Sequence, residues 1–255
     1  MQRKTIFLGW LLLGCTLYAA SPQNDSQPVN LITIPTAGVL PRGAYALDFR
    51  LFPNGGVWGE ISVGVSDRFM FGVAYGGGNI IGDQKVTWYP QPGVEVKYRL
   101  IEEGNKAPAV VLGFNSQGYG NYLDLDTLKR FETKAFGFYA VASKNYNLLG
   151  NLGLHAGINY NPLEKSDKDS DPNFFLGIDK EINSEISLLC EYNAAINDNR
   201  SHYSFGKGKG YLNAGIRWQA VDKIFVEVDF NNLLLNRRQI DYLTRELKIV
   251  VTEYF

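Results

Sequence analysis

The sequence GVEVKYRLI at residues 93–101 alternates apolar and charged side chains along its length. In an extended strand, successive side chains point to opposite faces. Glu95, Lys97 and Arg99 therefore share one face, and the apolar residues between them share the other. Three charges in a row need water or ionic partners, while the opposite face needs lipid or a protein core. This stretch predicts a strand that separates a polar space from an apolar one.

The same period of two recurs from residue 44 to the end of the chain. We expect strands at 44–52, 57–65, 69–76, 93–101, 108–116, 135–143, 151–160, 173–180, 185–194, 211–219, 223–230 and 246–255. Each has roughly the ten residues that a tilted strand needs to cross a bilayer. Beyond the first twenty residues, no stretch approaches the roughly 18 apolar residues of a membrane-spanning helix. The pattern predicts an all-β fold, an antiparallel transmembrane barrel of about 12 strands, in a range of roughly 10–14.

The connections between these segments alternate in length. The short ones lie at 66–68, 102–108, 181–185 and 220–223, and the long ones at 77–92, 117–133, 161–172, 195–210 and 231–245. Outer-membrane barrels combine short periplasmic turns with longer outer loops. We therefore expect both ends of the barrel sequence in the periplasm. A large soluble β-sandwich or a periplasmic barrel is the alternative, because it would show the same alternation.

The first twenty residues are typical of a signal peptide. Arg3 and Lys4 precede an apolar run that is too short to remain as a membrane span. Cleavage is expected near Ala19. Alternatively, the sequence LLGC ending at Cys15 resembles a lipobox, which would place a lipid on that cysteine. Residues 21–42 are expected to form a periplasmic leader, and residues 43–255 the barrel.

The end of the chain supports a location in the bacterial outer membrane. Outer-membrane barrels commonly end in an aromatic residue that the barrel-assembly machinery recognises, and this chain ends in Phe255 after an alternating apolar run. Glu253 interrupts that run. The formal net charge of −1 provides no basic field for nucleic acid. The expected partners are therefore outer-membrane lipid and the assembly machinery.

The strands carry a set of charged residues on the face opposite their apolar residues. This predicted lumen network contains Asp48, Arg50, Glu60, Glu95, Lys97, Arg99, Glu191, Arg217, Glu227, Asp229 and Lys248. Acids and bases are nearly balanced, so the set is typical of the polar network that fills a small barrel. A solute path lined by the same groups is the alternative.

Catalytic and cofactor chemistry finds little support. Only two histidines occur, and His155 is expected to face the lumen as one more polar residue. His202 and Ser204 are two apart, as in some outer-membrane lipid hydrolases. A serine nucleophile also needs an orienting third group, and no acid or amide lies at a suitable spacing on the next strand. We expect no metal, no cofactor and no enzyme, and keep a lipid hydrolase using His202 and Ser204 as an alternative.

The predicted outer loops are rich in aromatic residues. These are Trp88, Tyr89, Tyr119, Tyr122, Tyr203 and Phe205. Such rings are typical of the aromatic girdle of a membrane protein. Their planes also suit the apolar faces of sugars, so they are candidate stacking platforms.

A series of short motifs in residues 30–195 resembles one family. The series comprises Ile34-Pro35-Thr36-Ala37, Leu40-Pro41-Arg42-Gly43, Gly82-Asp83-Gln84, residues 96–103, residues 108–113 and Val141-Ala142-Ser143-Lys144. In this order the motifs resemble YjbH-type outer-membrane proteins. The resemblance implies a β-barrel linked to production or export of extracellular polysaccharide, in a family whose members are often described as candidate lipoproteins. Longer members carry further barrel sequence.

These observations lead to one main functional hypothesis. We expect a non-enzymatic outer-membrane barrel that is accessory to exopolysaccharide or capsule production or export, with polysaccharide and export proteins as partners. The polar lumen and the loop aromatics agree with this expectation. A small general pore and the lipid hydrolase are the alternatives.

Overall fold

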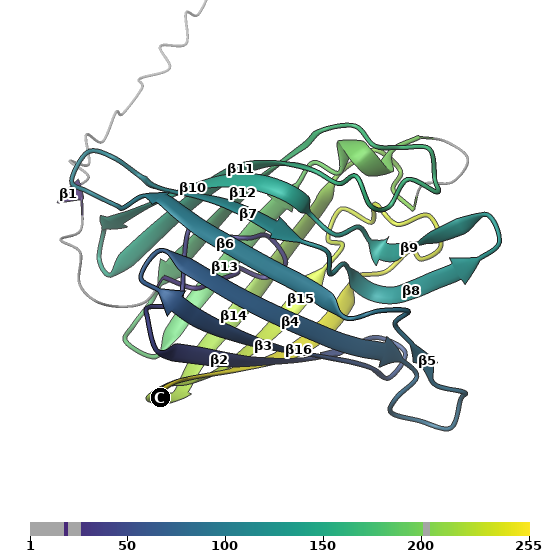
Figure 1. The fold of residues 1–255 in the computed structure, drawn as a ribbon, viewed down its shortest axis with the longest axis horizontal. Helices are drawn as coiled ribbons and strands as arrows, with labels where there is room; N and C mark the ends of the chain where they lie inside the picture. Colours follow the sequence, from purple (N-terminus) through teal and green to yellow (C-terminus); the bar gives the residue numbers. More distant parts are fainter. Residues whose placement is uncertain (1–17, 20–26, 201–204) are drawn as a thin grey trace, which may run out of the picture.

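The computed structural model describes residues 18–19, 27–200 and 205–255 (Figure 1). Within these residues, a fourteen-stranded antiparallel sheet contains two two-residue segments, β1 (Tyr18–Ala19) and β5 (Thr87–Trp88), and twelve long strands. The long strands are β2 (Ala44–Phe52), β3 (Gly56–Ser66), β4 (Phe69–Gly78), β6 (Gly93–Ile101), β7 (Ala109–Asn115), β10 (Gly137–Asn147), β11 (Asn151–Tyr160), β12 (Asn173–Glu181), β13 (Ile186–Asn193), β14 (Tyr211–Val221), β15 (Ile224–Asn231) and β16 (Thr244–Tyr254).

The sheet closes on itself through two pairings. The last strand, β16, pairs with β2, with Tyr254 opposite Ala44, and β7 pairs with β10, with Phe114 opposite Phe138. The other pairings among the twelve long strands join consecutive long strands of the chain. This closure leaves no unpaired sheet edge among the twelve strands, which is the condition for a β-structure in lipid. The predicted all-β, closed antiparallel barrel of about 12 strands is confirmed.

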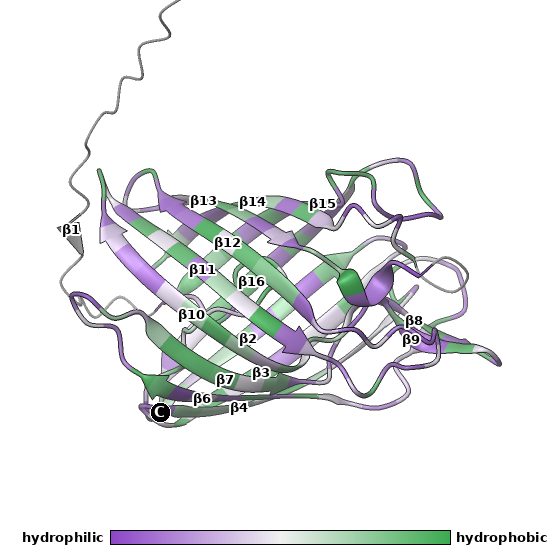
Figure 2. Ribbon diagram, turned by 90° about the horizontal axis from the view of Figure 1, so that it is seen from above, coloured by the Kyte–Doolittle hydropathy of each residue, from purple (hydrophilic) through white to green (hydrophobic). Residues whose placement is uncertain are grey.

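The alternation of side chains sorts the strands into two faces. Apolar side chains on the outer face, such as Phe49, Ile61 and Phe138, are exposed. Charged neighbours on the same strands, such as Arg50 and Glu60, are buried inside. Figure 2 shows the resulting alternation of hydrophobic and hydrophilic bands along the strands. An apolar exterior around a polar interior is the arrangement of a transmembrane barrel.

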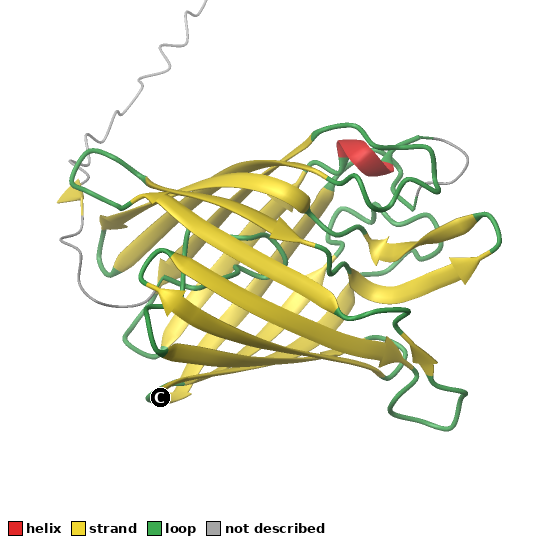
Figure 3. Ribbon diagram, viewed as in Figure 1, coloured by secondary structure: helices red, strands yellow, loops and turns green. Residues whose placement is uncertain are grey.

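The two ends of the barrel differ. Short turns and the C-terminus lie at one end, and the long connections lie at the other (Figure 3). The expected loop 117–133 contains a hairpin of its own, formed by β8 (Tyr119–Leu125) and β9 (Leu128–Thr133). The loop before β14 contains a short 3-10 helix, η1 (Ile196–Asp198). We call the end with the short turns and the C-terminus the turn end, and the end with the long connections the loop end.

Glu253, which interrupts the apolar run of the last strand, has a partner in the structure. The carboxylate of Glu253 accepts a hydrogen bond of 2.5 Å from Nζ of Lys223, and both side chains are exposed at the turn end. The ring of Phe255 lies 5.0 Å from that of Tyr45 on the first strand of the barrel. A charged residue is therefore accommodated beside the closing aromatic residue. No helix in the described part of the chain is long and apolar enough to cross a membrane.

Candidate functional site: an occupied lumen

Most of the described part of the leader lies inside the barrel. Residues 29–40, which we call the plug, form a tight reversal in which Leu31 N donates to Ile34 O at 2.9 Å and Thr36 N donates to Val29 O at 3.2 Å. The side chains of Leu31, Ile32 and Ile34 are fully buried. Figure 1 shows this segment as the dark purple trace enclosed by the strands. The sequence predicted a periplasmic leader at residues 21–42, and the entry of this segment into the lumen was not part of that prediction.

Glycines in the wall make room for the plug. A Cβ at Gly177 would lie 2.6 Å from Ile34 Cδ1 and 2.7 Å from Leu31 Cδ2. At Gly215, a Cβ would lie 3.3 Å from Ile32 Cδ1. Larger residues at these inward positions would therefore compete with the plug for the same volume.

A single carboxylate holds the tip of the plug. Glu191 on β13 accepts hydrogen bonds from the amides of Ile32 at 3.0 Å, Thr33 at 2.9 Å and Ile34 at 3.1 Å, and from the Thr33 hydroxyl at 2.5 Å. Converging main-chain amides of this kind form a nest for an anion. Because Glu191 is only 1% exposed, these charge-assisted bonds replace its hydration. We call this arrangement the clamp.

The predicted cations donate to main-chain carbonyls of the plug. These contacts are Arg50 Nη2 to Ile32 O at 2.7 Å, Lys97 Nζ to Val29 O, Arg99 Nη2 to Ala37 O at 3.2 Å, Arg217 Nη2 to Leu31 O at 3.1 Å, and Lys248 Nζ to Leu31 O at 3.1 Å. Five wall cations from four strands, with Lys97 and Arg99 both on β6, thus donate to carbonyls of the buried plug.

Wall carboxylates neutralise most of the same cations. Glu227 pairs with Arg217 at 2.5 Å and with Lys248 at 2.8 Å, and Arg50 pairs with Glu246 at 2.9 Å. Glu246 was not among the predicted network residues, although it stands two positions before Lys248 on the same inward face.

The remaining predicted acids also lie on the inner face. Glu95 lies 3.9 Å from Lys97, Glu60 accepts a hydrogen bond from the Ser62 hydroxyl at 2.6 Å, and Asp229 is fully buried. Both carboxylate oxygens of Asp229 and Oδ1 of Asp48 are buried without a hydrogen-bond partner within the described structure.

A serine, a histidine and an aspartate form a chain in the barrel wall. Ser143 Oγ lies 2.7 Å from His155 Nδ1, and His155 Nε2 lies 2.7 Å from Asp179 Oδ1. An ionised carboxylate only accepts, so Nε2 carries the proton and Nδ1 accepts from the Ser143 hydroxyl. The serine oxygen in turn accepts from the amide of Ala37 in the plug at 2.8 Å.

These are the residue types of a hydrolase triad, but their setting favours anchoring of the plug. Ser143 is fully buried beneath the plug, which leaves no approach for a substrate. Sequence reasoning placed His155 in the lumen and missed its partners, because they come from two other strands. His202 and Ser204 lie outside the described residues. Among those described, no group of three or more His, Cys, Asp or Glu residues could hold a metal ion.

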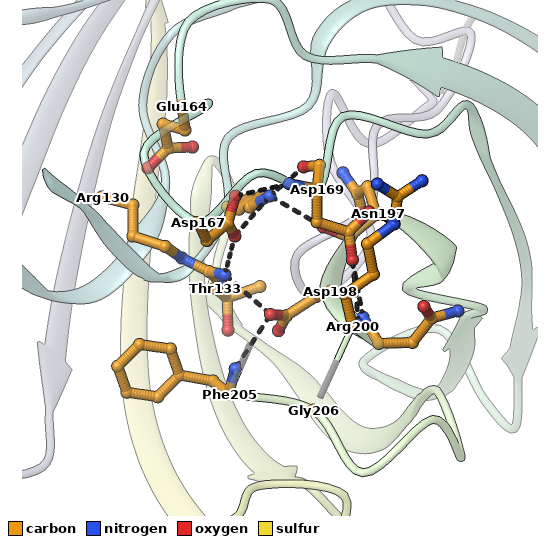
Figure 4. Close-up of polar contacts among 12 residues, drawn as sticks. Arg130, Thr133, Glu164, Asp167, Asp169, Asn197, Asp198, Arg200, Phe205 and Gly206 are labelled. Carbon is orange, nitrogen blue, oxygen red and sulfur yellow. Dashed lines mark hydrogen bonds and ion pairs between the residues drawn. The ribbon is translucent and has the colours of Figure 1, made fainter. Parts of the chain in front are cut away.

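The long loops form an ionic cap over the loop end (Figure 4). Arg130 on β9 pairs with Asp167 at 2.6 Å and with Asp198 at 2.7 Å, and Lys134 pairs with the same Asp167 at 2.6 Å. These contacts join the hairpin to two other loops. Glu164 accepts from the amides of Phe131 and Ala135, and burial raises the pKa of its carboxyl above the usual range. The sequence did not single out this network.

The predicted loop aromatics have different environments. Tyr89 and Tyr119 are buried, and Tyr122 packs edge-on against Phe131 with ring centroids 5.0 Å apart. The Phe205 ring lies 5.1 Å from the Arg130 guanidinium. Trp88 is exposed and stacks on Tyr75 at 6.0 Å, so it alone of these five offers an open ring face beside the barrel wall. Tyr203 lies outside the described residues.

Comparisons with known proteins provide structural neighbours only. No family model matches the sequence, and no curated protein matches it. The structures titled "KdgM porin" and "KdgM porin in complex with disordered oligogalacturonate" each show 10% identity and a TM-score of 0.47, and the structure of the NanC porin shows 10% identity and a TM-score of 0.44. Each similarity covers 83% of this chain and 99% of the other. At these values the likeness assigns no function to this chain.

Proposed function

We propose that this chain is an outer-membrane barrel that its own N-terminal segment holds closed, and that it opens a polar path when the plug moves. Its long loops face the outside, and its short turns and the first and last residues of the barrel sequence face the periplasm, in line with the usual asymmetry of loop lengths. The observation that carries the proposal is the binding of five wall cations and Glu191 to the main chain of the plug.

The wall would keep most of its ion pairs without the plug. Arg50 retains Glu246, while Arg217 and Lys248 retain Glu227. Water can replace the plug carbonyls as acceptors, so withdrawal leaves a hydrated, charged lumen rather than a set of unpaired charges. The charged groups of the lumen therefore have partners both when the plug is inside and when it is withdrawn.

The apolar residues of the plug favour the closed state. Leu31, Ile32 and Ile34 are each fully buried, and exposing each side chain costs about 1.5–3 kcal/mol. This cost comes in addition to the loss of the clamp. The resting protein is thus closed, and a ligand or partner is needed to shift the equilibrium.

Conductance in planar bilayers tests this gate. The wild-type protein should give few or no current steps, whereas a variant lacking residues 29–40 should give stable steps. A general pore predicts steps from the wild type itself. A folded deletion variant that stays silent would contradict the gate, with heat-modifiable migration on gels as the check of folding.

The role that we propose for this barrel is non-enzymatic assistance in the production or export of extracellular polysaccharide. The resemblance to YjbH-type proteins and the polar lumen support it. Polysaccharide and export proteins would then be partners. Deleting the gene should change the amount or attachment of secreted polysaccharide, and an unchanged polysaccharide profile would count against this role.

Lipid anchoring at Cys15, which lies outside the described residues, is tested by mass spectrometry of the mature N-terminus.

A further inference from the structure

Two loop segments at the loop end are joined into one surface, which we call the platform (residues 205–210 and 232–238). The amides of Lys207 and Lys209 both donate to Asn236 Oδ1, at 2.9 and 2.8 Å. Gly208 between them has a φ of 84°, a conformation that favours glycine. Arg238 donates from its amide to Phe205 O at 2.8 Å. The two segments are therefore held together by main-chain amides and by the side chain of Asn236.

The platform displays positive charge. Lys207, Lys209 and Arg238 are exposed. The two lysine ammonium groups donate to the neutral carbonyls of Leu235 and Leu234, at 3.2 and 3.4 Å. Among the residues that the structure describes, none of the three cations is ion-paired with a carboxylate. They remain available to an anionic ligand.

Four acids of the neighbouring loops are turned inward, whereas Asp124 and Asp241 remain exposed and Asp171 is half-buried. Glu164, Asp167, Asp169 and Asp198 are buried in the cap, where Arg130 and Lys134 neutralise part of their charge. Burial of these acids leaves the platform more basic than the formal net charge of −1 suggests. A polyanion approaching the loop end meets a positive local field.

A buried series of asparagines connects the platform with the clamp. The amide of Asn236 donates to Asn232 Oδ1 at 2.7 Å, and the amide of Asn232 donates to Asn213 Oδ1 at 3.0 Å. Asn213 Nδ2 then donates to Glu191 Oε1 at 2.8 Å. The same carboxylate holds the plug tip. All three asparagines are at most 5% exposed, so water does not compete for these bonds.

We propose that the platform binds a polyanionic glycan, such as a uronate-bearing chain, and that its occupancy is coupled to the plug through Asn236, Asn232, Asn213 and Glu191. The coupling rests on the proposed function, whereas the binding does not. Coupling between two sites is reciprocal, so release of the plug must change the glycan affinity of the platform by the same factor by which bound glycan changes the plug equilibrium.

The binding test uses the full-length protein in detergent with polygalacturonate as the probe and neutral dextran as the uncharged comparison. Replacing Lys207, Lys209 and Arg238 by Gln should weaken polygalacturonate binding tenfold or more. A matched variant with Gln at Arg42, Lys85 and Lys106 loses the same charge at other exposed positions and should bind like the wild type. Equal loss of polygalacturonate binding in both triple variants would overturn the proposed binding site. Binding of dextran as tight as that of polygalacturonate would overturn it too.

Lipopolysaccharide phosphates present similar anionic chemistry. The same variants are therefore tested with purified lipopolysaccharide. If the platform variant loses lipopolysaccharide binding while polygalacturonate never binds, the platform serves the membrane headgroups and the glycan proposal fails. Loss of polygalacturonate binding by the platform variant supports the proposal that the platform binds a polyanionic glycan.

The coupling test compares wild type with Glu191→Gln. The substitution weakens the clamp and should change the polygalacturonate Kd by threefold or more, because clamp and platform share the asparagine series. An unchanged Kd in a folded variant would overturn the coupling and leave the binding site standing. A silent barrel lacking residues 29–40 would instead contradict the gate, so the two failures are distinguishable.

Discussion

The hydroxyl of Tyr119 donates a 2.9 Å hydrogen bond to the main-chain carbonyl of Thr33, so the outer hairpin touches the tip of the plug inside the barrel. The Arg50 guanidinium lies 4.8 Å from the centre of the same ring and donates to the adjacent carbonyl of Ile32. The plug is therefore held from the wall and from the loops at one point. Each contact can be weakened separately.

Tyr119→Phe removes the hydroxyl and keeps the ring beside Arg50. A hydrogen bond of this type contributes about 0.5–1.5 kcal/mol, so amide exchange in residues 29–40 should become roughly two- to tenfold faster. Hydrogen-exchange mass spectrometry measures this directly. Tyr122→Phe on the same hairpin is the control and should leave the exchange unchanged. Unaltered exchange in the Tyr119 variant would show that the hairpin does not hold the plug.

Glu191→Gln keeps the size of the clamp residue and removes its charge. Hydrogen bonds to a charged group contribute about 1.5–3 kcal/mol, and a neutral amide can accept only part of the four donors. We expect current steps in planar bilayers at a frequency at least tenfold above that of the wild type. If the variant is as silent as the wild type, the clamp does not control opening.

Gly177→Leu places a side chain where Leu31 and Ile34 now pack. The barrel strands should still pair, because the added atoms point into the lumen, but the plug should be displaced. Conductance should rise and protease cleavage within residues 29–40 should appear. Gly59→Leu is the control, since that position faces outward, with Phe49 Cε1 3.4 Å from the built Cβ. Equal behaviour of both variants would argue against steric competition with the plug.

Ser143→Ala removes the acceptor of the Ala37 amide but leaves the His155–Asp179 contact. Leaving a buried amide unpaired costs about 1–3 kcal/mol, so exchange at residues 36–38 should accelerate by at least fivefold. The intact protein should not react with a fluorophosphonate at Ser143, because the plug covers the hydroxyl. A fluorophosphonate adduct at Ser143 in the wild type would contradict the anchoring role and reopen the hydrolase alternative.

The local pattern determined the barrel. Residues such as Glu95, Lys97 and Arg99 occur at alternate positions, and the period of two assigns each to a face before any partner is known. The same reasoning predicted twelve strands, closure and inward placement of the charged set. Glu246 was missed, although its register with Lys248 was visible in the sequence.

Only the tertiary structure decided what fills the barrel. Residues 29–40 have no strand periodicity, and the pattern provides no partner for them. Glu191 meets Ile34 across 157 positions, and Lys248 meets Leu31 across 217. Such contacts exist only after the sheet has closed and brought distant strands around one interior. Alternation encodes which face a side chain occupies, whereas the occupant of the enclosed space depends on shape and charge assembled from the whole chain.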